Sequence, residues 1–190
     1  MKMDPVKIQM KENVKKFLRP ATTAREVPIF YKSKAKEMIK SLLDEGIIME
    51  VTALTEFCSR ATFLPKSDGQ SLRLVMDYRT INNMILRPSW PFTSSHSLLT
   101  QIQQLLPYIA AVDLLLGYHQ VLLEEASSEL TTFLTPYGKF KFKRAPMGLS
   151  PSGDWFNLQT DKLIIGMEND LKSVDDLIFQ ASSIENWKNS

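Results

Sequence analysis

Three carboxylates stand out because their neighbours in the chain are apolar. Asp175 and Asp176 are adjacent and lead into Leu177–Phe179, while Asp113 lies in the apolar run Ala110–Leu116, which is typical of a buried strand. Two adjacent carboxylates repel each other and are costly to desolvate unless a cation shares their site. If the three converge, they form a hard, oxygen-rich site suited to Mg²⁺ and to phosphate chemistry.

The local pattern around the acidic pair also allows a different structure. The segment Ser173–Asp176 fits a helix capping box, and Leu177, Ala181 and Ile184 follow at helical spacing. Taken alone, this segment favours the start of a helix over a catalytic turn.

Composition limits the remaining classes of protein. With 190 residues, of which 44% are hydrophobic, the chain can form one large domain or two small ones, and its net charge of +2 does not by itself indicate a nucleic-acid binder. A single Cys58 excludes an internal disulfide and a cysteine-rich zinc site, and His96 and His119 are too few for a histidine-based metal centre. The first residues lack a signal peptide and no apolar run is long enough for a bilayer, so we expect an intracellular protein without membrane contact.

The amino-terminal half predicts an arm, a helix and a hairpin. Residues 1–30 are basic and interrupted by prolines, which indicates an extended arm. Residues 33–43 have helical periodicity, with Ser33 as the expected amino-terminal cap and Gly46 as the carboxyl-terminal one. Apolar runs at 61–64 and 72–76 flank an Asp-Gly turn and predict a β-hairpin.

The carboxyl-terminal half mixes strands and helices without regular alternation. The expected elements are a helix at 97–106, a strand at 109–114, a hairpin from 131–135 and 139–144, and a helix at 150–165. In the second strand of that hairpin, Phe140 and Phe142 should face one side and Lys139, Lys141 and Lys143 the other. Together these elements favour an α+β fold over a doubly wound sheet.

Five motifs occur in an order that points to a known family. They are Leu64–Gly69 (LPKSDG), Arg73–Asn82 (RLVMDYRTIN), Val112–Val121 (VDLLLGYHQV), Arg144–Ser150 (RAPMGLS) and Val174–Asp176 (VDD). In this order the chain resembles the reverse transcriptase of gypsy-type long-terminal-repeat retrotransposons, from about residue 6 to residue 182.

The resemblance implies an α+β fold of reverse-transcriptase-like fingers and palm subdomains with the thumb absent. With the basic extended arm that the residues themselves indicate at 1–30, the expected domains are this arm, the reverse transcriptase fingers and palm at 31–182 and a tail at 183–190. Asp113 would lie on the palm sheet and Asp175–Asp176 in a tight β-turn, which is the opposite of the helix start that the local pattern favours.

The resemblance also implies the catalytic site. Asp113 and Asp175 would bridge two Mg²⁺ ions, or Mn²⁺, and Asp176 would complete the acidic site, which is the two-metal arrangement of polymerases. The alternative is a polar turn plus one hydrogen-bonded Asp without a metal.

Five further residues match positions around the incoming deoxynucleoside triphosphate. Lys66 and Arg73 would contact the triphosphate, and Tyr118 would select deoxyribose by excluding a 2′-hydroxyl. Met147 and Gly148 would line the nucleotide pocket. The alternatives are a solvated hairpin tip for the two cations and ordinary packing for the tyrosine and methionine.

Four residues match positions near the template. Arg79 and Asn82 would lie near the template strand, and Lys141 and Lys143 could contact template phosphates. A local structural role for the first two, and a solvated basic face for the two lysines, are the alternatives.

We therefore expect a reverse transcriptase fragment of a retrotransposon polyprotein that uses an RNA or DNA primer–template and deoxynucleoside triphosphates in the cytoplasm. Only a short tail follows Asp176, so the primer grip and thumb are expected to be missing, or supplied by a partner chain, and activity in isolation to be weak or absent. The alternative function is a non-catalytic module, derived from a retroelement, that binds nucleic acid or another protein.

Overall fold

The computed structural model contains two compact units. One consists of Met1–Arg87 and Tyr118–Ser152, and the other of Pro88–Gly117 and Gly153–Ser190. The structure describes residues 4–12, 20–91, 107–163, 171–173 and 176–183. The helix expected at 97–106 lies outside these residues.

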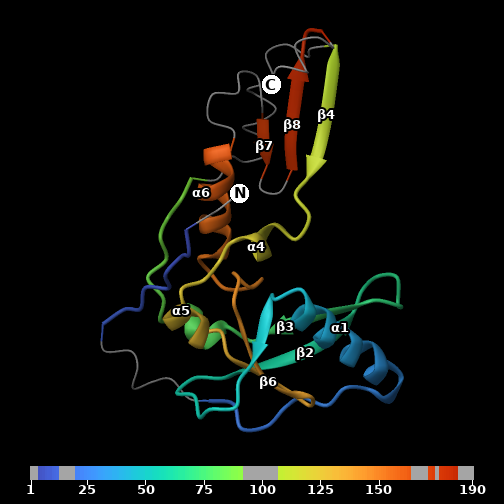
Figure 1. The fold of residues 1–190 in the computed structure, drawn as a ribbon, viewed down its shortest axis with the longest axis vertical. Helices are drawn as coiled ribbons and strands as arrows, with labels where there is room; N and C mark the ends of the chain where they lie inside the picture. The colour runs from blue at the N-terminus through green and yellow to red at the C-terminus, as the bar shows by residue number, and fades with distance from the viewer. Residues whose placement is uncertain (1–3, 13–19, 92–106, 164–170, 174–175, 184–190) are drawn as a thin grey trace. The chain divides into compact units, whose positions relative to one another are not determined.

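The first unit is built on a five-stranded sheet in the order β1-β6-β5-β2-β3. Figure 1 labels β2, β3 and β6 of this sheet. Its strands are β1 (Ile48–Glu50), β2 (Ser59–Pro65), β3 (Leu72–Met76), β5 (Phe133–Thr135) and β6 (Gly138–Phe142). The predicted hairpins are both present, as β2–β3 and β5–β6. A short parallel pairing between β2 and β5 joins the two hairpins into one sheet.

Helix α1 (Lys32–Asp44) follows the short 3₁₀ helix η2 (Ile29–Tyr31) and packs against β1 and β3. Its carboxyl-terminal end is as predicted, because Gly46 adopts a φ of 64° and its N–H donates to the Leu43 carbonyl. The predicted amino-terminal cap is wrong. The capping position falls at Tyr31, and the Ser33 hydroxyl donates instead to Glu37 one turn further on.

Residues 4–12, the first of the two described segments of the basic arm, run along the first unit rather than away from it. Val6 forms a parallel bridge with Leu123, and Met10 an antiparallel bridge with Ile85. Between them Ile8 is only 4% exposed. Its N–H donates to the hydroxyl of Ser127 in helix α5 (Glu125–Glu129) at 2.8 Å, so Ile8 anchors this segment to the core of the first unit.

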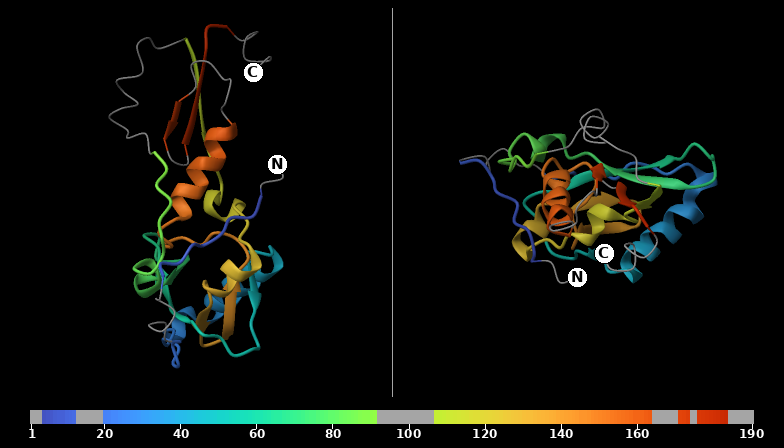
Figure 2. Two further views of the ribbon diagram at one scale, coloured as in Figure 1. Left: turned by 90° about the vertical axis from the view of Figure 1, so that its left-hand side faces the viewer. Right: turned by 90° about the horizontal axis from the view of Figure 1, so that it is seen from above.

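The second unit contains a three-stranded antiparallel sheet in the order β4-β8-β7, drawn from two sides in Figures 1 and 2. Its strands are β4 (Tyr108–Asp113), β7 (Leu171–Ser173) and β8 (Asp176–Ala181). The helix start that the local pattern favoured is therefore wrong, because Ser173 pairs with Asp176 in a hairpin. Strand pairing with β4 has overridden the local helical spacing.

Strand β4 differs from the buried strand that its apolar sequence predicted. Ile109 is 51% exposed and Val112 is 45% exposed. The physical reason is position, since within the described residues β4 pairs only with β8 and lies at an edge of the sheet.

Helix α6 (Ser152–Leu163), as predicted, lies beside this sheet and is tied to it by a buried lysine. The Lys172 ammonium in β7 lies 2.6 Å from the Asp161 carboxylate and donates to the Asn157 carbonyl. This pairing explains how the polar strand β7 packs on a helix, because a buried charge is tolerated when it is paired. None of the described helices is long and apolar enough to cross a membrane.

Candidate active site

The acidic residues lie at the adjoining ends of two paired strands. Asp113 ends β4, Asp176 begins β8, and the two are direct partners in the antiparallel register. Directly opposed residues in such a ladder point to the same face, with Cβ atoms about 4.5–5.5 Å apart. Both side chains are exposed. Asp175 lies outside the described residues.

This arrangement fits a divalent cation. Two like charges placed directly opposite each other destabilise a sheet, whereas a cation bound between them removes the repulsion and attracts both carboxylates. The donors are carboxylate oxygens, which Mg²⁺ and Mn²⁺ prefer. Asp113 and Asp176 could thus supply two ligands of one site; the described residues contain no cluster of three such groups, and the third candidate, Asp175, lies outside them.

The β2–β3 hairpin carries the two predicted phosphate-binding cations. Arg73 pairs with Leu64, and Lys66 follows two residues after Leu64, so strand alternation places both cations on one face. Both are exposed. They come from one hairpin and are charged groups available to an anion.

The tip of this hairpin is held by Asp68. Its carboxylate accepts hydrogen bonds from the N–H groups of Gln70 and Ser71, each at 2.8 Å, and from the Ser71 hydroxyl. The Ser71 side chain, followed by the two backbone N–H groups, lowers the pKa of Asp68 to about 2. Lys34 of α1 donates to the Gln70 carbonyl at 2.8 Å and ties the tip to the helix. The motif LPKSDG therefore encodes a preformed turn.

Tyr118 follows a glycine that the packing requires. Gly117 begins the short helix α4 (Gly117–Gln120), and a Cβ added to it would lie 2.6 Å from Cζ of Phe156. A tight turn precedes it, in which the Gly117 N–H donates to the Leu114 carbonyl and Leu116 has a φ of 53°. The sequence Leu-Leu-Gly-Tyr thus turns the chain sharply after β4 and begins the helix that carries Tyr118.

Met147 and Gly148 lie in the loop between β6 and α6. The side chain of Met147 is 54% exposed, and Gly148 has a φ of 86°, which only glycine adopts readily. Asn82, the last residue of α2 (Arg79–Asn82), reaches this loop. Its amide nitrogen donates to the Gly148 carbonyl at 2.9 Å, and its amide oxygen accepts from the Ser150 N–H at 2.8 Å. No local sequence pattern predicts this contact, because 66 residues separate Asn82 from Gly148.

Arg79 is bound to a neighbouring carboxylate. Its guanidinium makes two hydrogen bonds to Asp77, both at 2.8 Å, while the arginine side chain remains 86% exposed. This side-chain contact lowers the pKa of Asp77 to about 2. A template phosphate could still approach the exposed edge of the guanidinium.

Lys141 is not on the solvated face that strand alternation predicted. Its side chain is only 6% exposed, and its ammonium contacts the carboxylates of Glu125 and Glu129 in α5. Burial by itself would lower the pKa of Lys141, but the two glutamates outweigh it and raise the pKa. A template phosphate would have to compete with both glutamates for this cation. Lys143, two residues on, is exposed.

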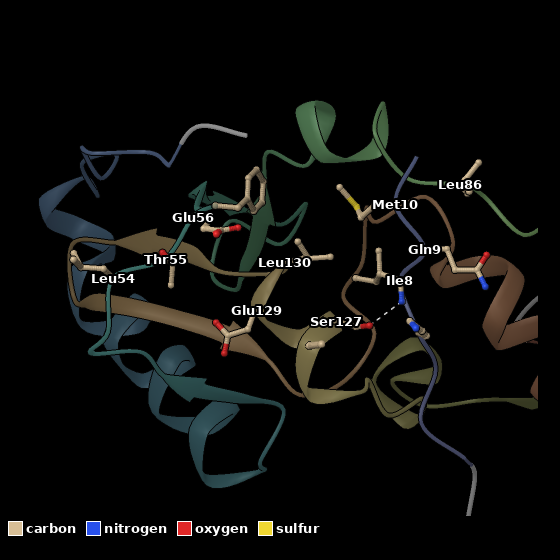
Figure 3. A pocket seen from close by; sticks show the side chains of 13 residues that line it. Ile8, Gln9, Met10, Leu54, Thr55, Glu56, Leu86, Ser127, Glu129 and Leu130 are labelled. Atoms are coloured by element: carbon tan, nitrogen blue, oxygen red, sulfur yellow. Dashed lines mark hydrogen bonds between the residues drawn. The ribbon is translucent and has the colours of Figure 1, made fainter. Parts of the chain in front are cut away.

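The first unit also contains a large cavity of about 770 Å³ (Figure 3). It lies between the arm, the loop before β2 and helix α5. Two of its lining residues, Ile8 and Ser127, are joined by the hydrogen bond described above. Leu54, Leu86 and Leu130 make much of its lining apolar. None of the predicted site residues lines this cavity, so it is not the nucleotide pocket that the motifs predict.

Comparison with known sequences places the whole motif series in one family. A family model described as "Reverse transcriptase (RNA-dependent DNA polymerase)" matches residues 64–189. The Pol polyprotein from transposon 412 of Drosophila melanogaster is 35% identical over 104 residues, 55% of this chain and 8% of that protein. The polyprotein from transposon gypsy of the same species is 28% identical over 131 residues, 66% of this chain and 12% of its own length.

A viral relative covers nearly the whole chain. The "Enzymatic polyprotein" of figwort mosaic virus (strain DxS) is 28% identical over 197 residues, 97% of this chain and 29% of that protein. The chain therefore spans less than a third of the length of each of these relatives.

Solved structures agree on the fold. A prototype foamy virus protease-reverse transcriptase mutant matches 99% of this chain, and 24% of its own, with a TM-score of 0.84 at 21% identity. The foamy viral protease-reverse transcriptase in complex with dsDNA matches 98% of this chain, and 38% of its own, with a TM-score of 0.83 at 22% identity. At these identities the likeness concerns the fold, which is that of fingers and palm.

Proposed function

Since the chain belongs to the reverse transcriptase (RNA-dependent DNA polymerase) family, we propose that it carries the nucleotidyl-transfer site of a retroelement polymerase. The reaction joins the α-phosphorus of a deoxynucleoside triphosphate to the primer 3′-oxygen and releases pyrophosphate, directed by an RNA or DNA template. The hydroxyl proton leaves to solvent or to a nearby base.

The direct pairing of Asp113 with Asp176 carries this proposal. Strands β4 and β8 place the two carboxylates on one face of the sheet, and a fixed backbone of this kind supplies the positioning that such a reaction needs. Together with Asp175 they would hold two Mg²⁺ ions, or Mn²⁺. When bound, the metal supplies charge neutralisation at the phosphates and a lowered pKa for the attacking hydroxyl.

The remaining residues would bind and orient the substrates. Lys66 and Arg73, on one face of a preformed hairpin, would bind the triphosphate. Tyr118, Met147 and Gly148 would form the wall of the nucleotide pocket, and the tyrosine ring would exclude a 2′-hydroxyl. These roles rest on the motif matches and on the exposure of the two cations.

The template would contact the first unit through exposed cations. Of Lys141 in β6 and Lys143 just beyond it, Lys143 is the better candidate, because the Lys141 charge is already neutralised by Glu125 and Glu129. Arg79 would contact a template phosphate while keeping its bond to Asp77.

Single-nucleotide primer extension on an RNA template with Mg²⁺ tests the proposal. We expect Asp113→Asn and Asp176→Asn each to reduce extension at least about 100-fold, because losing one metal carboxylate removes several kcal/mol of transition-state stabilisation. Asp44→Asn is the matched control, since it makes the same change at an exposed carboxylate in α1. It should leave extension unchanged.

Binding of the primer–template separates the proposal from its alternative. If the folded wild-type chain binds primer–template in a salt-dependent manner but never extends it, the non-catalytic binding module becomes the better description. Extension that survives in both Asp variants would overturn the assignment of the two carboxylates.

A further inference from the structure

Asn82 spans a turn of the β6–α6 loop with both ends of its side-chain amide. The nitrogen donates to the Gly148 carbonyl and the oxygen accepts from the Ser150 N–H. The two contacts require a donor and an acceptor on the same planar group, and they fix the two peptides that flank Leu149. Leu149 itself is only 3% exposed, so the contacted segment is anchored to the core on its other side.

Helix α2, which carries Asn82, is a rigid support although it is short. The Asn82 N–H donates to the Tyr78 carbonyl at 2.8 Å. Tyr78 is 2% exposed and its hydroxyl donates to the Thr131 carbonyl, while Ile81 is fully buried. The position of Asn82 is therefore set by the core of the first unit, and through Asn82 the same core sets the backbone of the loop.

We propose that Asn82 is a positioning residue for the nucleotide pocket rather than a template contact. It holds Met147 and Gly148 in a single conformation, with Gly148 at a φ of 86°, so that the exposed Met147 side chain is presented in a fixed place. The link to the nucleotide pocket rests on the proposed function. The clamp, by which we mean the two hydrogen bonds of the Asn82 amide to Gly148 and Ser150, rests on the observed contacts alone.

The requirement for an amide distinguishes this role from a phosphate contact. A residue that binds template phosphate can be replaced by a cation, and its loss weakens template binding. A clamp tolerates neither a cation nor an apolar isostere, since each leaves the Gly148 carbonyl or the Ser150 N–H without its partner.

Amide hydrogen exchange of Ser150, followed by NMR on the folded chain, tests the clamp directly. In Asn82→Ala the Ser150 N–H loses its acceptor, and its exchange should accelerate roughly 5–10-fold, the factor expected for one hydrogen bond. In Asn82→Asp the acceptor remains, so Ser150 should stay within about twofold of wild type, and this variant also serves if Asn82→Ala does not fold. Asn83→Ala, at the next and exposed residue of the same segment, is the control and should change nothing.

A functional measurement then separates positioning from template contact. Positioning predicts that Asn82→Ala weakens binding of the deoxynucleoside triphosphate, while the Kd for primer–template and its salt dependence stay at wild-type values. Unchanged Ser150 exchange in Asn82→Ala, or a loss of primer–template affinity with nucleotide binding intact, would overturn the proposal. Because exchange needs no catalysis, its result stands even if the chain proves inactive, which would count only against the proposed function.

Discussion

Replacing Gly117 by alanine should destabilise the second unit although alanine is the better helix former. The added Cβ would lie 2.6 Å from Cζ and 2.8 Å from Cε2 of Phe156. Carbon atoms prefer separations of about 3.5–4.0 Å, so the overlap is about 1 Å at two atoms. Phe156 is 3% exposed and cannot swing into solvent.

The magnitude follows from two opposing effects. Overpacking of this kind costs about 1–3 kcal/mol. The gain from replacing glycine by alanine in a helix is at most about 1 kcal/mol, and is smaller at the first residue of a four-residue helix. We therefore expect Gly117→Ala to lower the free energy of unfolding by about 1–2 kcal/mol.

Urea unfolding followed by tryptophan fluorescence measures this change, because Trp155 lies buried in α6, one residue before Phe156. Phe156→Leu shortens the clashing side chain and should alone cost about 1 kcal/mol. The double variant should be at least about 1 kcal/mol more stable than the sum of the two single effects predicts. Strict additivity, or an unchanged midpoint in Gly117→Ala, would refute the clash.

Two further perturbations test the first unit. Changing Glu125 and Glu129 together to glutamine should lower the free energy of unfolding in urea by about 2–4 kcal/mol, because it leaves the ammonium of Lys141 buried without a counter-ion. Lys141→Met should lower it less, since the two exposed carboxylates return to water. A larger loss of stability in Lys141→Met than in the double glutamine variant would contradict this reasoning. The pKa of Asp77 is lowered in the folded state to about 2 from 3.8, so the stability that its bond to Arg79 contributes should be complete above pH 3.8 and be lost as the pH falls through 2. The stability of Asp77→Asn should lack this loss between pH 3.8 and 2 when acid unfolding is followed. Identical acid unfolding curves for wild type and Asp77→Asn would refute the contribution of the bond to Arg79.

The fold was predictable from sequence where turn chemistry and alternation act locally. Asp68 and Gly69 specify the β2–β3 turn through the hydrogen bonds of one carboxylate and a φ of 62°, both properties of the residues themselves. Gly46 ends α1 for the same reason.

Prediction failed where a distant partner decides the outcome. Ser173–Asp176 has the pattern of a helix start, and only pairing with β4 makes it a hairpin. The alternation of β6 predicts a solvated side chain for Lys141. In the structure its ammonium is instead bound by the two glutamates of α5, which lie twelve and sixteen residues earlier in the chain. The order of the motifs along the chain identified the candidate site residues. The contact of Asn82 with the β6–α6 loop, by contrast, could not be predicted from any local pattern.

The division of the chain into two units has a consequence for synthesis on the ribosome. The first unit is complete once residue 152 has emerged, but β4 of the second unit is made earlier and meets its partner β8 only about 60 residues later. At about 5–20 residues per second, the unpaired apolar edge of β4 waits for roughly 3–12 s. During that interval Ile109 and Val112 present a strand that nascent neighbours on the same messenger can pair with. Slowing translation between codons 113 and 176 should therefore increase the demand of this chain for chaperones.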